Sequence, residues 1–184
     1  RYAKAECMNV EFVRRRTRFA RWWRRGWIAA AVLVIDQASK QLALMYLAGS
    51  KGVVLAPFFA LTLAYNTGAA FNLLSDAGGW QNGFFVIVGA IASIALLVML
   101  RRAASHERQM EIALWLILGG ALGNLANRLV YGHVIDFLYL YYGSWHWPIF
   151  NLADAAISIG TLLLILDALG IRLFQRTAPE APLT

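Results

Sequence analysis

Long runs of hydrophobic residues recur along the chain, and four of them approach the length of a membrane-spanning helix. They cover about residues 27–47, 84–100, 112–130 and 152–171. A helix needs roughly 20 apolar residues to cross the hydrocarbon core of a bilayer. These runs lack the broad polar face of a helix that packs on the surface of a soluble domain. The pattern therefore predicts an all-α membrane protein with four transmembrane helices.

The connections 48–83 and 131–151 have a different pattern, in which β-branched and aromatic residues gather in short segments. VVLAPFFALTLAYN in the first connection predicts strands, and VIDFLYLYYGSWHWPIFN in the second predicts two strands around a turn at Gly143 and Ser144. The run AAFNLLSDAGGW predicts a short surface helix. We expect a small sheet at one membrane surface, although each Tyr or Trp equally fits a simple interfacial belt.

Basic residues are distributed unevenly around the predicted spans. Nine of the 17 Lys and Arg residues precede the first span, three lie between the second and third, and two follow the fourth. Short loops rich in Lys and Arg stay in the cytoplasm. Both termini are therefore expected to be cytoplasmic, and the connections 48–83 and 131–151 to lie outside. The net charge of +7 is then explained by topology and contact with membrane lipids, and nucleic acid is not expected as a partner.

Three segments follow from this distribution: a basic N-terminal tail over residues 1–26, a membrane domain over 27–171 and a C-terminal tail over 172–184. Cys7 is the single cysteine, which excludes an internal disulfide framework. The three histidines lack the spacing of a zinc site. Neither a metal nor another cofactor is expected.

Several polar residues interrupt the apolar spans. Asp36 and Lys40 lie four residues apart in the first span, near its middle, and share a helix face. Charges inside a membrane usually face a bundle interior or a water-filled cavity. A structural ion pair is the simplest interpretation, and a role in chemistry remains open. Asn124 and Arg128 are spaced in the same way in the third span; Arg128 either extends to the headgroups or binds an anionic or carbonyl-rich partner.

The start of the fourth span also carries polar residues. Asn151 there fits a helix N-cap, with Asp154 favoured in the first turn by the helix dipole. However, the third and fourth spans run in opposite directions, so the outer end of one and the outer start of the other lie at the same height. Six polar residues are thereby expected at one level of the membrane: Asn66, Asn124, Arg128, Asp136, Asn151 and Asp154. Packing alone does not require such a group.

Two aspartates can hydrolyse an amide without a nucleophile from the protein. If they share a proton, one draws a proton from water while the other donates to the scissile carbonyl. The one cysteine lies on the cytoplasmic side of this level, which excludes a thiol nucleophile. A pairing of Ser144 with His146 remains open.

Five ordered segments, DQASK, YNTGAAF, GGALGNLANRL, GHVIDF and FNLADAAIS, closely resemble the lipoprotein signal peptidases, also called signal peptidase II. The resemblance covers most of the chain, from about Trp27 to Gly170. It implies four transmembrane helices, a small extracytoplasmic β cradle and an aspartic endopeptidase of the bacterial inner membrane. It also implies a diacylglyceryl-modified prolipoprotein substrate cut just before its lipidated Cys, and inhibition by globomycin. Separately, we expect the protein to be a monomer.

The resemblance also assigns roles to residues. The catalytic pair corresponds to Asp136 and Asp154. The substrate-binding positions correspond to Asn66, Asn124, Arg128 and Asn151, and the structural polar pair corresponds to Asp36 and Lys40. One position departs from the family pattern GNxxDR, because Asn127 stands where Asp is usual. We expect this change to affect how Arg128 is held.

Two other function classes compete with a peptidase. A small transporter or channel subunit would use the Asp36–Lys40 pair as part of a polar pathway, with polar residues in both halves of the membrane. Here the cytoplasmic half offers little beyond Glu111 and Asp167 near helix ends. A non-catalytic relative that only binds lipoprotein precursors would differ from an enzyme in activity alone.

Overall fold

The structure is a computed structural model that describes residues 2–68, 79–103 and 108–174, with side chains from Arg25 onward. Its helices are α1 (Tyr2–Leu47), α2 (Gln81–Arg102), α3 (Arg108–Tyr131) and α4 (Leu152–Ala168). Its strands are β1 (Val53–Ala56), β2 (Phe59–Asn66), β3 (Val134–Tyr142) and β4 (Trp145–His146). The surface helix expected after β2 falls mostly on residues 69–78, outside the described residues.

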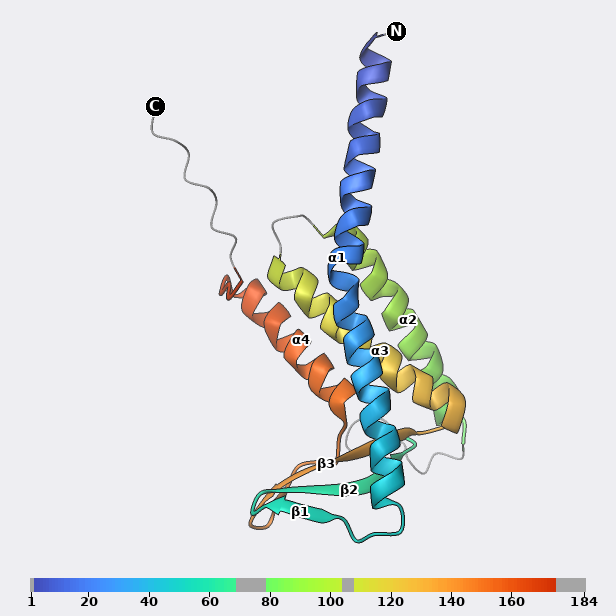
Figure 1. Ribbon diagram of the computed structural model, residues 1–184, viewed down its shortest axis with the longest axis vertical. Coiled ribbons are helices and arrows are strands. Elements are labelled where there is room, and N and C mark those ends of the chain that lie inside the picture. The colour runs from blue at the N-terminus through green and yellow to red at the C-terminus, as the bar shows by residue number, and fades with distance from the viewer. Residues whose placement is uncertain (1, 69–78, 104–107, 175–184) are drawn as a thin grey trace.

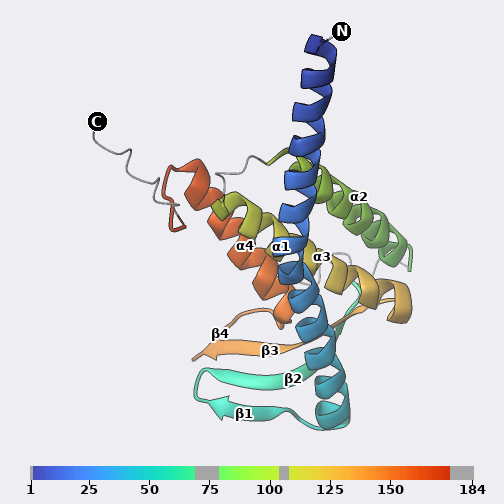
Figure 2. The ribbon, with the colours of Figure 1, turned by 45° about the horizontal axis from the view of Figure 1, so that its top comes forward.

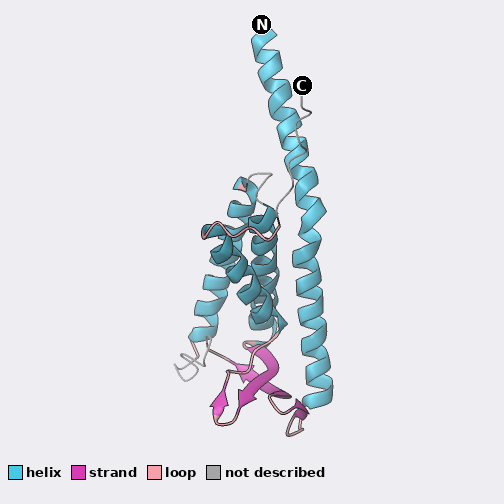
Figure 3. Ribbon diagram, turned by 90° about the vertical axis from the view of Figure 1, so that its left-hand side faces the viewer, coloured by secondary structure: helices cyan, strands magenta, loops and turns pink. Residues whose placement is uncertain are grey.

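The strands form one antiparallel sheet at one end of the helical bundle. The order is β1-β2-β3-β4, and consecutive strands pair with one another (Figure 2). The turn between β3 and β4 contains Gly143 with a φ of 59°, a conformation that glycine adopts without steric cost. The small sheet expected from the sequence is confirmed. The N-terminal end of α1 and the C-terminal end of α4 lie at the opposite end of the bundle (Figures 1 and 3).

Helix α3 is central and packs against α1, α2 and α4. Glycines allow close approach on two of its faces. A Cβ atom on Gly119 would lie 2.8 Å from the Cβ atom of Val32 on α1. A Cβ atom on Gly120 would lie 2.4 Å from the backbone oxygen of Ala153 on α4. The first turn of α4 is therefore held directly against the backbone of α3.

The outer surface of the bundle is apolar, as expected for a chain that contacts lipid. Ile87, Ile91 and Ile94 recur along one face of α2 and are 60%, 62% and 62% exposed. Soluble proteins rarely expose continuous apolar surface of this kind. Three segments among the described residues are long and apolar enough to cross a membrane: residues 25–47 of α1, helix α2 and helix α3.

The remaining predicted span corresponds to α4, which has 17 residues. A bilayer core usually requires roughly 20, so the fourth span stays a prediction. The predicted boundary between an N-terminal tail and the first span falls inside α1, which runs without interruption from Tyr2 to Leu47.

The sheet is fixed to α1 by a small apolar core. Ala43 and Leu47 on α1 pack with Phe137 on β3, and all three are buried. Side chains alternate between the two faces of a strand, so Asp136 points away from Phe137. The register pairs Asn66 with Val134 and Ala64 with Asp136. This register places Asn66 and Asp136 on the same face of the sheet.

Candidate active site

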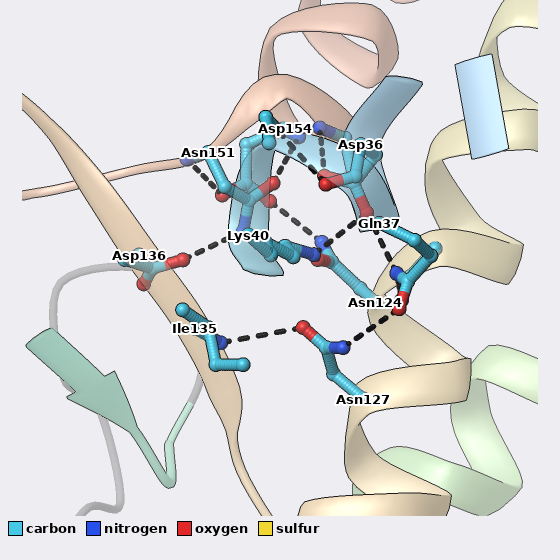
Figure 4. Close-up of polar contacts among 12 residues, drawn as sticks. Asp36, Gln37, Lys40, Asn124, Asn127, Ile135, Asp136, Asn151 and Asp154 are labelled. Carbon is cyan, nitrogen blue, oxygen red and sulfur yellow. Dashed lines mark hydrogen bonds and ion pairs between the residues drawn. The ribbon is translucent and has the colours of Figure 1, made fainter. Parts of the chain in front are cut away.

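Asp136 and Asp154 come from different elements and are joined by one side chain, that of Asn151. Asp136 lies on β3, and Asp154 lies in the first turn of α4. The Asn151 Nδ2 atom donates to Asp136 Oδ1 at 2.6 Å, and Asn151 Oδ1 accepts from the backbone nitrogen of Asp154 at 3.0 Å. Figure 4 shows Asn151 between the two aspartates. The level shared by these residues was expected from the antiparallel spans.

The N-cap interpretation of Asn151 and Asp154 is also correct. The backbone nitrogen of Asn151 donates to Asp154 Oδ2 at 3.2 Å, which completes a reciprocal capping box at the start of α4. The cap uses the oxygen of the Asn151 amide, and the nitrogen of the same amide binds Asp136. Capping and assembly of an aspartate pair are therefore two results of one geometry, not alternatives.

Two further asparagines each donate to one carboxylate. Asn66 Nδ2 donates to Asp136 Oδ2 at 3.1 Å, and Asn124 Nδ2 donates to Asp154 Oδ1 at 2.7 Å. With the bonds from Asn151, every oxygen of the two carboxylates accepts a hydrogen bond. Such donors stabilise ionised carboxylates.

Burial disfavours the ionised form of Asp136, which is only 2% exposed. Desolvation raises the pKa of Asp136 from 3.8 to about 6, and the nearby charge of Asp154 acts in the same direction. The hydrogen bonds from Asn151 and Asn66 oppose this rise. A carboxyl group with a pKa close to neutral can hold a proton at one stage of a reaction and release it at another.

The Asp36–Lys40 pair lies beside this site. Both side chains are fully buried, and Lys40 Nζ donates to Asp36 Oδ2 at 2.8 Å. Asp36 Oδ1 accepts from the backbone nitrogen of Ala153 at 2.9 Å, and Lys40 Nζ also donates to Asn124 Oδ1 at 3.0 Å. The pair expected near mid-membrane is thus level with the first turn of α4 and in contact with the network around Asp154.

Arg128 completes the set of predicted residues. Its Nη2 atom donates to the backbone oxygen of Gly68 at 2.7 Å, and its guanidinium carbon lies 4.7 Å from the centre of the Phe85 ring. Its Nη1 atom is buried and has no hydrogen-bond partner among the described residues. Arg128 therefore points inward, and one of its donors remains for a ligand.

Three side chains that contact this site were not assigned a role in it from the sequence: Gln37, Phe85 and Asn127. Asn127 Nδ2 donates to Gln37 Oε1 at 3.1 Å, and Asn127 Oδ1 accepts from the backbone nitrogen of Ile135 at 3.4 Å. Phe85 is the stacking partner of Arg128. The family departure at Asn127 thus bears on how α3 contacts α1 and β3, because its amide binds Gln37 and Ile135.

Two adjoining cavities open at the aspartates. One, of about 340 Å³, is lined by both aspartates together with Asn66, Asn124, Arg128 and surrounding apolar residues. The other, of about 390 Å³, extends over the sheet past Tyr139 and His146. The two share five lining residues: Asn66, Asp136, Trp147, Pro148 and Ile149. An extended ligand could therefore pass Asp136 from one cavity to the other.

The alternative pairing of Ser144 with His146 has no support within the described part of the chain. The His146 Nδ1 atom lies 2.7 Å from the Tyr139 hydroxyl, and no hydrogen bond joins His146 to Ser144. Ser144 does not line either cavity.

The profile of the family described as signal peptidase (SPase) II matches residues 28–170. The chain belongs to the signal peptidase II family. A protein of Burkholderia mallei strain SAVP1 named lipoprotein signal peptidase is 50% identical over 145 residues, covering 78% of this chain and 87% of that protein. A protein of Photorhabdus laumondii with the same name is 48% identical over 142 residues, covering 77% and 85%.

Solved structures agree with this assignment. A bacterial membrane enzyme determined by the in meso method at 2.3 Å resolution aligns with a TM-score of 0.69 and 30% identity, over 84% of this chain and 93% of that chain. A second bacterial membrane enzyme, at 1.9 Å resolution, aligns with a TM-score of 0.67 and 33% identity, over 78% and 90%. This signal peptidase II family member is thus a membrane peptidase, and the transporter or channel alternative loses its support.

Proposed function

We propose that this protein is an aspartic endopeptidase that removes the signal peptide from diacylglyceryl-modified prolipoproteins, cutting just before the lipidated Cys. The observation that carries the aspartic mechanism is the pair Asp136 and Asp154, which line one cavity and are bridged by the Asn151 amide. The named relatives support the substrate class.

Each aspartate has a role in the proposed reaction. One carboxylate takes a proton from water, whose oxygen attacks the scissile carbonyl carbon, while the protonated carboxyl donates to the carbonyl oxygen. The tetrahedral intermediate then breaks its C–N bond, and the amine of the lipidated Cys leaves with a proton from the pair. The two apparent pKa values of such a pair belong to the pair as a unit. The pKa of Asp136, raised to about 6 by burial, suits the member that carries the proton.

Four residues are proposed to bind the substrate and to hold the two aspartates in place: Asn66, Asn124, Asn151 and Arg128. Arg128 lines the cavity with the aspartates, and its unpartnered Nη1 atom would donate a hydrogen bond to a backbone carbonyl of the extended peptide. The second cavity, over the sheet, offers a path for the chain on the other side of the scissile bond.

We also propose a location for the enzyme. It crosses the bacterial inner membrane four times, with both termini in the cytoplasm and the aspartates at the outer face. The acyl chains of the substrate then stay in the outer leaflet, and the signal helix lies beside α3 and α4. The protein acts as a monomer, and a globomycin-type inhibitor would compete for the same cavity.

The deciding experiment is cleavage of a diacylated precursor by the purified protein in detergent. The wild type should release the signal peptide, and globomycin should prevent this release. Asp136→Asn and Asp154→Asn should each abolish cleavage, and the double variant should be hardly worse, because residues that act as a unit are not additive. The singles should still fold and bind precursor.

A matched control distinguishes loss of a catalytic carboxylate from the general effect of removing one negative charge. Asp167→Asn alters an aspartate at the far end of α4, distant from the cavity, and should leave cleavage unchanged. Near wild-type turnover in either Asp136→Asn or Asp154→Asn would exclude the pair. Binding of precursor without any cleavage by the wild type would identify a non-catalytic relative.

A further inference from the structure

Lys40 is a buried cation that the proposed reaction does not use. Its side chain is 0% exposed, and its Nζ atom lies 3.0 Å from Asn124 Oδ1. An ammonium group has donors and no acceptor. The atom of the Asn124 amide that faces Lys40 must therefore be the oxygen.

The orientation of the Asn124 amide determines whether its N–H group or its oxygen faces the carboxylate of Asp154. Because the oxygen of Asn124 faces Lys40, its nitrogen faces Asp154 and donates to Oδ1 at 2.7 Å. With the amide reversed, an oxygen would face the carboxylate, and that arrangement favours a protonated Asp154. The direction of one amide thus selects the protonation state of one member of the pair.

Two other asparagines hold the aspartates, and backbone groups orient both of them. The Asn66 oxygen accepts from the backbone nitrogen of Gly68 at 3.0 Å, which turns its nitrogen toward Asp136. The Asn151 oxygen accepts from the backbone nitrogen of Asp154 at 3.0 Å, with the same result. Among these three amides, Asn124 is the one oriented by a charged side chain, because its oxygen accepts from Lys40 Nζ at 3.0 Å and, over a longer distance of 3.2 Å, from Asn151 Nδ2.

Resting on the proposed function, we infer that Lys40 is a positioning residue that acts on Asp154 through Asn124. It keeps the Asn124 N–H directed at Asp154, and its charge favours ionised Asp154 as the member that takes the proton from water. The described charged groups around the pair are Asp36 and Lys40 from α1 and Arg128 from α3, while β2 contributes neutral Asn66. Asp36 balances Lys40 and itself binds the start of α4 through Ala153.

The test has to separate this role from the stability of the buried ion pair. Removing Lys40 alone would leave Asp36 buried and unpaired, which is strongly destabilising. We therefore use the Asp36→Asn variant as the reference and add either Lys40→Met or Lys40→Gln to it. Met removes the donor and the charge, whereas Gln keeps an amide donor near Asn124. Lys51→Met, on an exposed loop, is the matched control.

The readout is the pH profile of kcat/KM for diacylated precursor, beside thermal unfolding in detergent. With Lys40→Met, the acidic limb should move to higher pH by about one unit, and kcat below neutral pH should fall about tenfold. With Lys40→Gln, kcat should fall less, because Asn124 stays oriented. Asp36→Asn alone should not move the acidic limb to higher pH, and Lys51→Met should leave the profile unchanged.

Coupling to Asn124 gives a second measurement. In an Asn124→Ala background, Lys40→Met should cause a clearly smaller additional shift of the acidic limb, because the amide through which Lys40 acts is gone and only the effect of its charge remains. An undiminished shift would overturn the role of Asn124. A merely structural role of Lys40 would lower the unfolding temperature and leave the profile in place, which overturns the inference. Failure of both Lys40 variants to fold, where Asp36→Asn folds, also assigns Lys40 to stability and overturns it. If the wild type cleaves precursor but the pH profile of kcat/KM does not change in the Lys40 variants, this inference alone is overturned. If the wild type does not cleave precursor, the proposed function is overturned as well.

Discussion

At the scale of single residues, Asn151 shows how one side chain can serve a helix and a site together. Its oxygen caps α4 by accepting from the Asp154 backbone nitrogen, and its nitrogen holds Asp136. A residue with a single polar atom in its side chain could do the first task but not both. Asn is therefore required here by the second contact, since Ser, Thr and Asp cap helices about as well.

Asn151→Ser separates these two tasks. Serine preserves the cap, so the free energy of unfolding should change by less than about 1 kcal/mol. Loss of the bond to Asp136 leaves this carboxylate poorly placed, and turnover of diacylated precursor should fall at least about 100-fold. Thermal unfolding and turnover are measured on the same preparation. If stability and activity fell together, Asn151 would act only as a helix cap, and its contact with Asp136 would not matter for turnover.

The raised pKa of Asp136 predicts how stability depends on pH. The folded protein holds this proton up to about pH 6, whereas the unfolded chain releases it near 3.8. Between these values the folded state binds more protons, so stability decreases as pH rises, by up to about 3 kcal/mol in total. Asp136→Asn lacks this penalty. The stability of wild type relative to Asp136→Asn should therefore decline from pH 4 to pH 7 in detergent unfolding experiments, and a flat difference would contradict the buried-carboxyl account.

At the scale of elements, helix α3 fixes the position of the first turn of α4, which carries Asp154. Its Gly119 and Gly123 face α1, where a Cβ atom on Gly123 would lie 2.5 Å from Asp36 Oδ2. The neighbouring Gly120 instead faces the backbone of Ala153, one residue before Asp154. In the sequence, Gly119 and Gly123 form a small-xxx-small pattern, which predicts a close helix contact. The role of Gly120 does not follow from this pattern, because it depends on which face of α3 meets α4.

Gly120→Ala tests this contact. The added methyl group would meet the Ala153 backbone oxygen at 2.4 Å, so the first turn of α4 must move. We expect a loss of about 1–3 kcal/mol in stability and a loss of turnover, because Asn151 and Asp154 move with that turn. Gly83→Ala on α2 is the control, since its Cβ would meet nothing within 4 Å. Equal, small effects of both changes would contradict the close contact.

The elements themselves follow from the sequence more directly than their contacts do. Hydrophobic runs and aromatic segments predicted the helices and the sheet, because length and composition largely determine them. The common level of Asn124, Asn151 and Asp154 followed from the antiparallel direction of adjacent spans. The bond from Ala153 to Asp36 could not be predicted in this way, because the relative depth of α1 and α4 depends on side-chain packing with the sheet.

At the scale of the whole molecule, the polar site and the basic residues lie toward opposite ends of the bundle. The sheet and the first turn of α4, which carry the aspartates, lie at one end, and the C-terminal end of α2 and the N-terminal end of α3 lie at the other (Figures 1 and 3). Arg101 and Arg102 end α2, and Arg108 begins α3, so that all three lie at this second end. A bilayer across the bundle therefore separates a basic side from the side that carries the site.

The positive-inside rule turns this separation into an orientation. A reporter that is active only in the periplasm should be silent when fused after Thr184, and active when inserted at the exposed turn of Gly143 and Ser144. A cytoplasm-specific reporter at the same two positions should give the reverse pattern, which controls for expression. The result also depends on α4, because its 17 residues must cross the membrane to bring the C-terminus back to the cytoplasm. Periplasmic activity at both positions would mean that α4 does not span the membrane. Periplasmic activity after Thr184 and silence at the turn would invert the protein, and would put the aspartates on the side where diacylated precursors are not exposed.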